Sequence, residues 1–464
     1  MLFISIPFLL FWIGYFLLHL LVPSRHRLWL VIAGGTVFYG YWNPAYVWIP
    51  HVLSLVAFAG AHWMAGAADP SSKRLRLIFV LAVLFAPLAV FKYADFLLQQ
   101  GRSLAGAGAG GGLGLPLPLG ISFMTFSLAA YVVDAYRGVF AVRRDFLGVN
   151  GYALFFPAML NGPILRPHQL MLQLDRPGRA LDAAMSAGVA LFSVGLVKKL
   201  VFADQIAPFV DAVYGGAAPL TAEQYLLGIY GFSLQIYCDF SGYTDMALGL
   251  ALLLGLQLPI NFDRPYGAPS LIDFWRSWHM SLSNWFRDYV YIPLGGSRHG
   301  FLSQIGGLLA TMGLVGLWHG ASWTFVFWGL YHGGGIALAH GFRKSCGRLA
   351  ARLPQWLAVL VTFHAVTLGW VLFRAADLGT SWRVLSGPFV APTGDLASFA
   401  STHLFALCLL GVFIVTHRFD SHDAIHRLVA RAPASLLWPA LALMWTLAIA
   451  VSGGNSGRFI YFDF

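Results

Sequence analysis

Apolar segments of about 20 residues recur along the chain, and their length is the strongest constraint on its fold. The first runs from 2 to 22 and is interrupted only by Ser5 and His19. About 20 apolar residues are what a helix needs to cross the hydrocarbon core of a bilayer. Of the 464 residues, 58% are hydrophobic and 10% are charged, against about 25% charged in an average soluble domain. The sequence therefore predicts an all-α, polytopic integral membrane protein, a helical bundle with about 10–13 crossings plus short interfacial or re-entrant helices.

Basic clusters between the apolar segments predict the orientation of the chain. Lysines and arginines number 29 and acidic residues 19, which gives a formal net charge of +10. The clusters fall at 25–27, 73–76 and 137–144, after alternate crossings. Because basic residues accumulate in cytoplasmic loops, these loops are predicted to be cytoplasmic and the N-terminus periplasmic. No basic run on a polar surface accompanies them, so nucleic acid is excluded as a partner.

Prolines divide the chain into three regions of one predicted transmembrane domain, 1–464. Regular crossings occupy 1–150, and regular crossings return at 341–464. Between them, at 150–340, prolines shorten the apolar runs. Irregular backbone at membrane depth is tolerated where it is buried in protein or lines a cavity, so this middle region is the predicted catalytic core. The three cysteines are isolated, so no thiolate metal site is predicted.

The segment 273–291, DFWRSWHMSLSNWFRDYVY, is the most informative in the middle region. At 100° per residue its aromatic and aliphatic side chains fall on one arc, and Arg276, Ser281 and Asn284 fall on the opposite face. The pattern predicts a helix over 273–289 that lies along the membrane interface. His279 sits at the edge of the aromatic arc. It is either a hydrogen-bonded core histidine or a histidine that faces a reaction cavity.

A second histidine lies in the segment 313–323, GLVGLWHGASW. His319 follows about a dozen uncharged residues, and an ionisable residue at membrane depth is a candidate functional residue. Gly316 and Gly320 would let a neighbouring backbone or a ligand approach closely. The alternative role for His319 is a helix–helix contact, as for the nearby His332 and His340.

Other ionisable residues also lie in apolar sequence. Asp239 and Asp245 are the first and last residues of the run DFSGYTD, where a carboxylate either orients a histidine or an arginine, or is paired structurally. Arg166 either recognises an anionic donor or is an interfacial charge.

Lys198 and Lys199 end an apolar run and are expected to face the cytoplasm. His422 and His426, in a loop with further His and Asp, have a spacing compatible with zinc, but no Glu or Cys completes the set and no metal site is predicted.

The two histidine segments together resemble the membrane-bound O-acyltransferase (MBOAT) family, in its bacterial alginate O-acetyltransferase branch. The resemblance rests on the run from 239 to 296 and on GLWHGASW, with further matches at 118–138, 161–167 and 459–464. It implies a ring-like helical bundle with funnels from both membrane faces. His319 matches the principal active-site histidine of the family, and His279 matches its second motif position.

The resemblance also implies the reaction. Family members transfer an acyl group from a carrier to a hydroxyl. In this branch an acetyl group, from acetyl-CoA as the expected donor substrate and without a cofactor, crosses the bacterial inner membrane. Partners that resemble periplasmic SGNH-type esterases, within a polysaccharide synthesis and export complex, then O-acetylate an exopolysaccharide such as alginate or cellulose. D-Alanyl transfer to teichoic acid, a polysaccharide or lipid transporter and a non-catalytic export scaffold are the alternatives.

Histidine suits such a reaction because its unperturbed pKa lies near neutrality, so it can accept the proton of the attacking hydroxyl. His319 could equally carry the acetyl group covalently. His319 and His279 are thus the candidate catalytic residues. The candidate substrate-binding residues are Arg166, Asp239, Tyr243, Asp245, Arg276, Trp278, Asn284, Trp318, Ser322 and Trp323.

The predicted orientation can be tested by cysteine labelling of intact cells, in a background without the three native cysteines. A cysteine at position 74 should stay unlabelled by a membrane-impermeant reagent, because the basic loop that contains it is cytoplasmic. The apolar run 77–98 leads outward to the glycine-rich segment 101–114, which is predicted to lie on the periplasmic side. A cysteine at position 103 should therefore be labelled readily. The reverse pattern would contradict the orientation.

Overall fold

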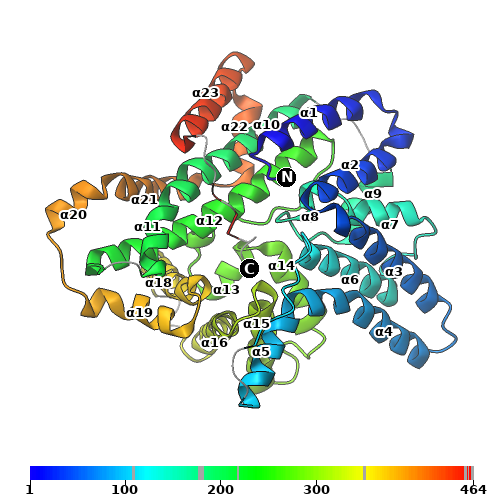
Figure 1. Ribbon diagram of the computed structural model, residues 1–464, viewed down its shortest axis with the longest axis horizontal. Coiled ribbons are helices and arrows are strands. Elements are labelled where there is room, and N and C mark those ends of the chain that lie inside the picture. Colours follow the sequence, from blue (N-terminus) through cyan, green and yellow to red (C-terminus); the bar gives the residue numbers. More distant parts are fainter. Residues whose placement is uncertain are drawn as a thin grey trace. The chain divides into compact units, whose positions relative to one another are not determined.

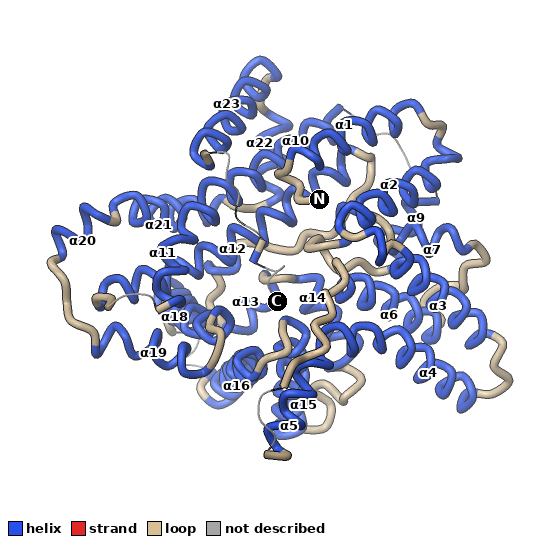
Figure 2. The backbone as a smooth tube through the Cα atoms, in the orientation of Figure 1, coloured by secondary structure: helices blue, strands red, loops and turns tan. Residues whose placement is uncertain are grey.

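The computed structural model describes residues 1–106, 110–175, 182–216, 219–347, 352–453, 457 and 459–460. In this part of the chain every regular element is a helix and no strand occurs (Figure 2). The prediction of an all-α membrane protein is therefore confirmed. Residues 461–464, the end of one segment that resembles the family, lie outside the described residues.

Six helices of the described part are long and apolar enough to cross a membrane, or seven if the bent pair Leu396–Thr402 and Leu404–Phe419 forms one span. Shorter apolar helices fall below that length, and the predicted total of about 10–13 crossings stays a prediction. The six candidate spans are Pro44–Ala65, Pro70–Leu104, Ala184–Gly215, Phe301–His319, Gln355–Arg374 and Ala434–Ser452.

The chain forms two compact units. The first comprises Met1–Val189 and Ala247–Pro259. In it α3 (Trp48–Ala65), α4 (Pro70–Leu88) and α6 (Ile121–Arg137) pack side by side (Figure 1). This division neither confirms nor contradicts the single predicted domain or its core at 150–340. The helices of the first unit are α1 (Ile6–Leu21), α2 (Arg27–Trp42), α3 (Trp48–Ala65), α4 (Pro70–Leu88), α5 (Ala94–Leu104), α6 (Ile121–Arg137), α7 (Phe146–Ala153), α8 (Phe156–Met159) and α9 (Pro167–Asp175).

The second unit comprises Ala190–Met246 and Ile260–Phe464 and contains both motif histidines. Two helices belong to it only in part. They are α10 (Asp182–Val197), which enters this unit at Ala190, and α12 (Ala222–Leu253), which leaves it after Met246. Its other helices are α11 (Asp204–Gly215), α13 (Leu271–Ser277), α14 (Met280–Phe286), α15 (Phe301–His319), α16 (Trp323–Ser345), α18 (Gln355–Arg374), α19 (Leu378–Val390), α20 (Leu396–Thr402), α21 (Leu404–Thr416), α22 (His422–Arg431) and α23 (Ala434–Ser452).

Glycines bring α15 and α16 into backbone contact. A Cβ atom on Gly316 would lie 2.1 Å from the carbonyl oxygen of Phe325, and one on Gly329 would lie 2.1 Å from that of Met312. A Cβ on Gly320 would meet the Phe325 ring at the same distance. The expectation that Gly316 and Gly320 allow close approach is therefore confirmed. Met312 on α15 contacts Gly329 on α16, whereas the later residue Gly316 contacts the earlier residue Phe325. The two helices therefore form an antiparallel hairpin.

A second glycine contact joins α10 to α12. A Cβ on Gly195 would lie 2.3 Å from the carbonyl oxygen of Gly242, and one on Gly242 would lie 2.8 Å from that of Gly195. The two backbones therefore touch at this level. Lys198 and Lys199, which follow Gly195, are thereby held against the face of α12.

Gly329→Ala should destabilise the protein, because the new methyl group has no space against the Met312 backbone. Overpacking of this kind costs about 1–3 kcal/mol. Gly334→Ala is the matched control on the same helix, since nothing lies within 4 Å of its Cβ position. Thermal unfolding of the purified protein in detergent should show a lower Tm for Gly329→Ala only. Equal Tm values for the two variants would contradict the described hairpin contact.

Candidate active site

His319 is held at the turn between α15 and α16. It is the last residue of α15, and its side chain belongs to the buried interior. Its imidazole contacts the rings of Trp318, Trp328 and Phe373, at centroid distances of 4.9, 5.1 and 5.1 Å. Ser322 then caps α16 by accepting a hydrogen bond from the Thr324 amide. Aromatic rings thus enclose His319 on several sides and exclude water from them.

His279 lies at a break in the backbone between α13 and α14. It is fully buried, and its φ of 42° is in the left-handed region. Its ring contacts Phe240 at 4.7 Å and Trp318 at 5.9 Å. Burial lowers the pKa of the His279 imidazole to about 3, so the ring is neutral at ordinary pH. Because Trp318 also contacts His319, one indole ring touches both motif histidines.

The prediction of one continuous helix over 273–289 is wrong, because the helix breaks at Trp278 and His279. The physical reason is competition from another segment. The Met280 amide donates to the Asn261 carbonyl oxygen and the Asp263 amide donates to that of Ser277. These bonds to 261–263 replace helical ones. The predicted division into faces still holds, since the aromatic and aliphatic side are buried at Trp275, Trp278, Leu282, Trp285 and Phe286.

The remaining candidate residues have different surroundings. Trp278 is buried against Trp370, at 4.8 Å between ring centroids. Arg276 is exposed and pairs with Asp273, and Trp323 is half exposed. Asn284 is partly exposed. Arg166 belongs to the first unit, where its backbone amide donates to Gln169.

A cavity of about 460 Å³ lies beside the residues that follow His319. Ser322, Thr324 and Phe325 line it. Phe325 packs on Phe373 at 5.0 Å, and the Phe373 ring contacts His319. The cavity is therefore close to the histidine, and its volume is in the range of small-molecule sites. The polar and charged residues of its lining are Lys199, Asp204, Asp211, Gln235, Asp239 and Arg374.

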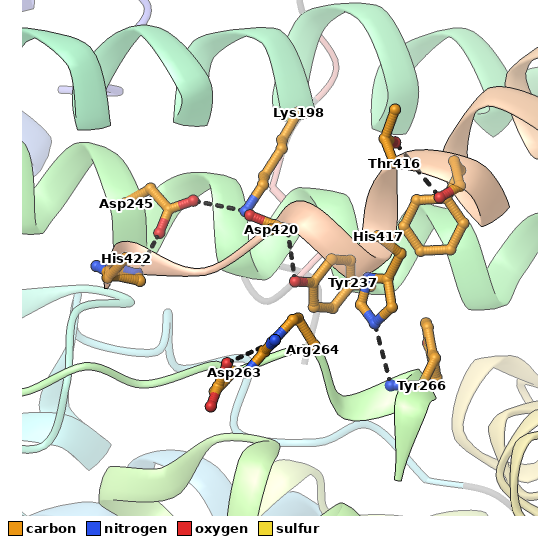
Figure 3. Close-up of polar contacts among 11 residues, drawn as sticks. Lys198, Tyr237, Asp245, Asp263, Arg264, Tyr266, Thr416, His417, Asp420 and His422 are labelled. Carbon is orange, nitrogen blue, oxygen red and sulfur yellow. Dashed lines mark hydrogen bonds and ion pairs between the residues drawn. The ribbon is translucent and has the colours of Figure 1, made fainter. Parts of the chain in front are cut away.

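Lys198 and Lys199 are buried, so the expectation that they face the cytoplasm is wrong. Figure 3 shows the surroundings of Lys198. Its Nζ lies 2.7 Å from Asp245 Oδ2 and 2.7 Å from Asp420 Oδ2. His422 Nε2 lies 3.0 Å from Asp245 Oδ1, and the Tyr237 hydroxyl donates to Asp420 Oδ2 at 2.6 Å. Lys198 therefore ties α12 to the segment that precedes α22.

Lys199, the next residue, forms a second buried cluster. Its Nζ lies 2.6 Å from Asp239 Oδ1 and 2.8 Å from Asp204 Oδ1. The Ile460 amide donates to Asp239 Oδ2 at 2.9 Å. The Phe459 ring lies under the ammonium at 4.4 Å and meets Tyr243 at 4.6 Å. This cluster holds the end of the described chain.

These contacts favour structural pairing for Asp239 and Asp245, one of the two roles left open by the sequence. Asp245 does bind a histidine, but that residue is His422 and not a motif histidine. The loop that suggested zinc spacing is tied into the protein, since Asp420 binds Lys198 and His422 binds Asp245. Sequence reasoning missed these pairs although a signal existed, because charges within apolar sequence must be paired.

Lys199→Met should strongly destabilise the protein, because it leaves the carboxylates of Asp204 and Asp239 buried without their cation. Breaking a buried ion pair costs about 3–5 kcal/mol. The matched control is Arg287→Ala, since the Arg287–Asp288 pair has its arginine more than half exposed and exposed pairs contribute about 0–1 kcal/mol. Membrane abundance and Tm should fall for Lys199→Met only. A Lys199→Met protein as stable as the control would contradict the described cluster.

Comparison with known proteins identifies the family of this chain. Residues 139–376, which include both histidines, match the profile of MBOAT, the membrane-bound O-acyltransferase family. The chain is 34% identical over 412 residues to the protein named "Probable alginate O-acetylase AlgI" of Azotobacter vinelandii, covering 88% of this chain and 82% of the relative.

Two further relatives differ in the acceptor that their names give. The peptidoglycan O-acetyltransferase of Helicobacter pylori is 34% identical over 407 residues, which cover 81% of this chain and 76% of the relative. The teichoic acid D-alanyltransferase of Bacillus subtilis is 29% identical over 273 residues, 55% of this chain and 68% of the relative. With its all-helical fold and its candidate membrane spans, this chain belongs to the membrane-bound O-acyltransferase family and is a multi-pass membrane enzyme of that class.

Proposed function

We propose that this protein is an O-acetyltransferase that takes an acetyl group from cytoplasmic acetyl-CoA and delivers it to a secreted polysaccharide of the alginate type. The observation that carries the proposal is that the rings of His319 and His279 both contact the Trp318 ring. A cavity of about 460 Å³ is lined by Ser322, Thr324 and Phe325, which follow His319 closely in the chain. The identity of 34% to alginate and peptidoglycan O-acetylating relatives supports acetyl as the group transferred.

In the proposed reaction a hydroxyl oxygen attacks the carbonyl carbon of the acetyl thioester. The new C–O ester bond forms and the C–S bond breaks, and the thiolate of CoA leaves. His319 accepts the hydroxyl proton and returns it to the thiolate. A positioned histidine base contributes about 10²–10⁴-fold to such a rate. The thioester is already electrophilic, and the aromatic walls keep water from competing with the hydroxyl.

The proposed setting is the bacterial inner membrane, with the N-terminus in the periplasm. The acceptor is then a periplasmic partner of the SGNH esterase type, or the polymer that such a partner modifies. Within this proposal the buried pairs of Asp239 and Asp245 with lysines are structural. Arg276 and Trp323 are the most exposed of the candidate substrate-binding residues, so such a partner or substrate can reach them.

His319→Ala should reduce acetyl transfer by about 10²-fold or more, because no proton acceptor remains at that position. His279→Ala should be impaired less if it only positions the substrate. The measurement is acetyl content of the secreted polysaccharide, together with transfer of labelled acetyl from acetyl-CoA in membranes. Normal acetylation by an abundant His319→Ala protein would overturn the catalytic role and leave a transporter or scaffold. Labelled acetyl trapped on His319 would instead point to a covalent route.

His340→Ala is the better control of the two packing histidines. His340 is only partly buried. His332 is fully buried and accepts a hydrogen bond from Trp275 at 3.4 Å, and its ring contacts Trp328 at 5.1 Å. Since Trp328 also contacts His319, a change at His332 would disturb the candidate site indirectly. His340→Ala should retain full activity and abundance.

A further inference from the structure

The backbone before α13 brings one buried amide against His279. Asn261 is fully buried and comes from the extended segment that breaks the helix. Its Oδ1 lies 3.2 Å from His279 Nδ1, 3.1 Å from the Ser281 amide nitrogen and 2.8 Å from Ser281 Oγ. Its backbone oxygen also accepts from the Met280 amide at 2.9 Å. One residue thus receives hydrogen bonds from three successive positions around the break.

The Ser281 amide identifies which end of the Asn261 side chain faces it. A backbone N–H can only donate a hydrogen bond, so the side-chain atom 3.1 Å away is the carbonyl oxygen and not the amino group. That oxygen carries no proton. The His279 Nδ1 atom, which lies on the same oxygen, must therefore be the protonated nitrogen of the ring. In the neutral imidazole the lone pair is then on Nε2.

The backbone of His279 is unusual in the same place. His279 and Arg264 are the two non-glycine residues of the described chain with a positive φ. Such a conformation persists only where surrounding contacts hold it, and it occurs preferentially at functional sites. Here the contacts are the bonds to Asn261 on one side and the rings of Phe240 and Trp318 on the other.

We propose that Asn261 is a positioning residue of the acetyl-transfer site, which fixes His279 in the tautomer with the proton on Nδ1 and the lone pair on Nε2. This inference rests on the proposed function. The Nε2 atom can then accept a proton, or a hydrogen bond from an N–H, of a group held against Trp318. The Trp318 ring contacts both His279 and His319. An orienting group bound to the distal nitrogen of a histidine is the arrangement by which base-and-orienter pairs work.

Two substitutions at Asn261 separate positioning from simple packing. Asn261→Leu has a similar volume but no acceptor, so Nδ1 loses its partner and the tautomer is no longer fixed. Asn261→Asp keeps the oxygen that accepts from Ser281 and adds a negative charge beside the imidazole. An opposite charge at this distance favours the charged ring and raises its pKa by about one to three units. The rings of Phe240, Phe262 and Trp318 also contact the His279 ring, and all three are uncharged.

The experiment measures the transfer of labelled acetyl from acetyl-CoA by membranes that contain the full chain and its acceptor, across a range of pH. Asn261→Leu should lower kcat about tenfold or more with an unchanged KM for acetyl-CoA. Asn261→Asp should retain more activity than Asn261→Leu, with the acidic limb of its pH profile displaced to higher pH by about one to three units. Ser281→Ala removes only one donor to the same oxygen and should keep the profile of the unchanged protein.

The outcomes separate this inference from the proposed function. If the unchanged protein transfers acetyl and Asn261→Asp has the same pH profile as it, the positioning role is overturned and the acetyltransferase stands. Asn261→Leu and Asn261→Asp that lose kcat equally, at equal abundance, would likewise overturn it, because a packing role makes no distinction between them. If the unchanged protein transfers no acetyl from acetyl-CoA, the proposed function itself fails.

Discussion

The ammonium groups of Lys198 and Lys199, which directly follow α10, determine how the second unit is assembled. A charge in apolar surroundings is tolerated only with partners of opposite charge, and each lysine has two carboxylates. Lys198 points to Asp245 and Asp420, whereas Lys199 points to Asp239 and Asp204. The two side chains therefore connect α12 to α11, to the segment before α22 and to the end of the described chain. Four segments distant in sequence share one level of the structure because these charges must meet there.

Helix α12, which supplies Asp239 and Asp245, also carries part of the candidate active site. Asp239 holds Lys199, and the next residue, Phe240, packs edge-on against His279 at 4.7 Å. The ion cluster and the histidine pocket are thus built on consecutive residues of α12. The glycine contact between Gly195 and Gly242 makes this possible, because any side chain there would separate α10 from α12. Charge pairing and backbone contact fix α12, and α12 supplies one wall of the pocket.

The sequence predicted those features that depend on neighbours along the chain. Apolar length predicted membrane helices, and the periodicity of 273–291 predicted which side chains are buried. The break at Trp278 and His279 could not be predicted this way, because it depends on hydrogen bonds from 261–263. The burial of Lys198 was missed for a similar reason. The apolar surroundings indicate that the lysine needs a partner, but that partner, Asp245, is 47 residues away and the local pattern does not identify it.

The break in the helix decides how the His279 side chain is placed. In an unbroken helix over 273–289, His279 would lie at the edge of the aromatic arc, and its direction would follow from helical geometry. With left-handed backbone at His279, α13 and α14 each bury their own aromatic residues, and the imidazole is placed independently of both. Its position is then set by Asn261, Phe240 and Trp318. Packing and the proposed chemistry are thereby separated within seventeen residues of sequence: the helical turns supply the buried surface, and the interruption between them supplies the imidazole that the proposed reaction uses.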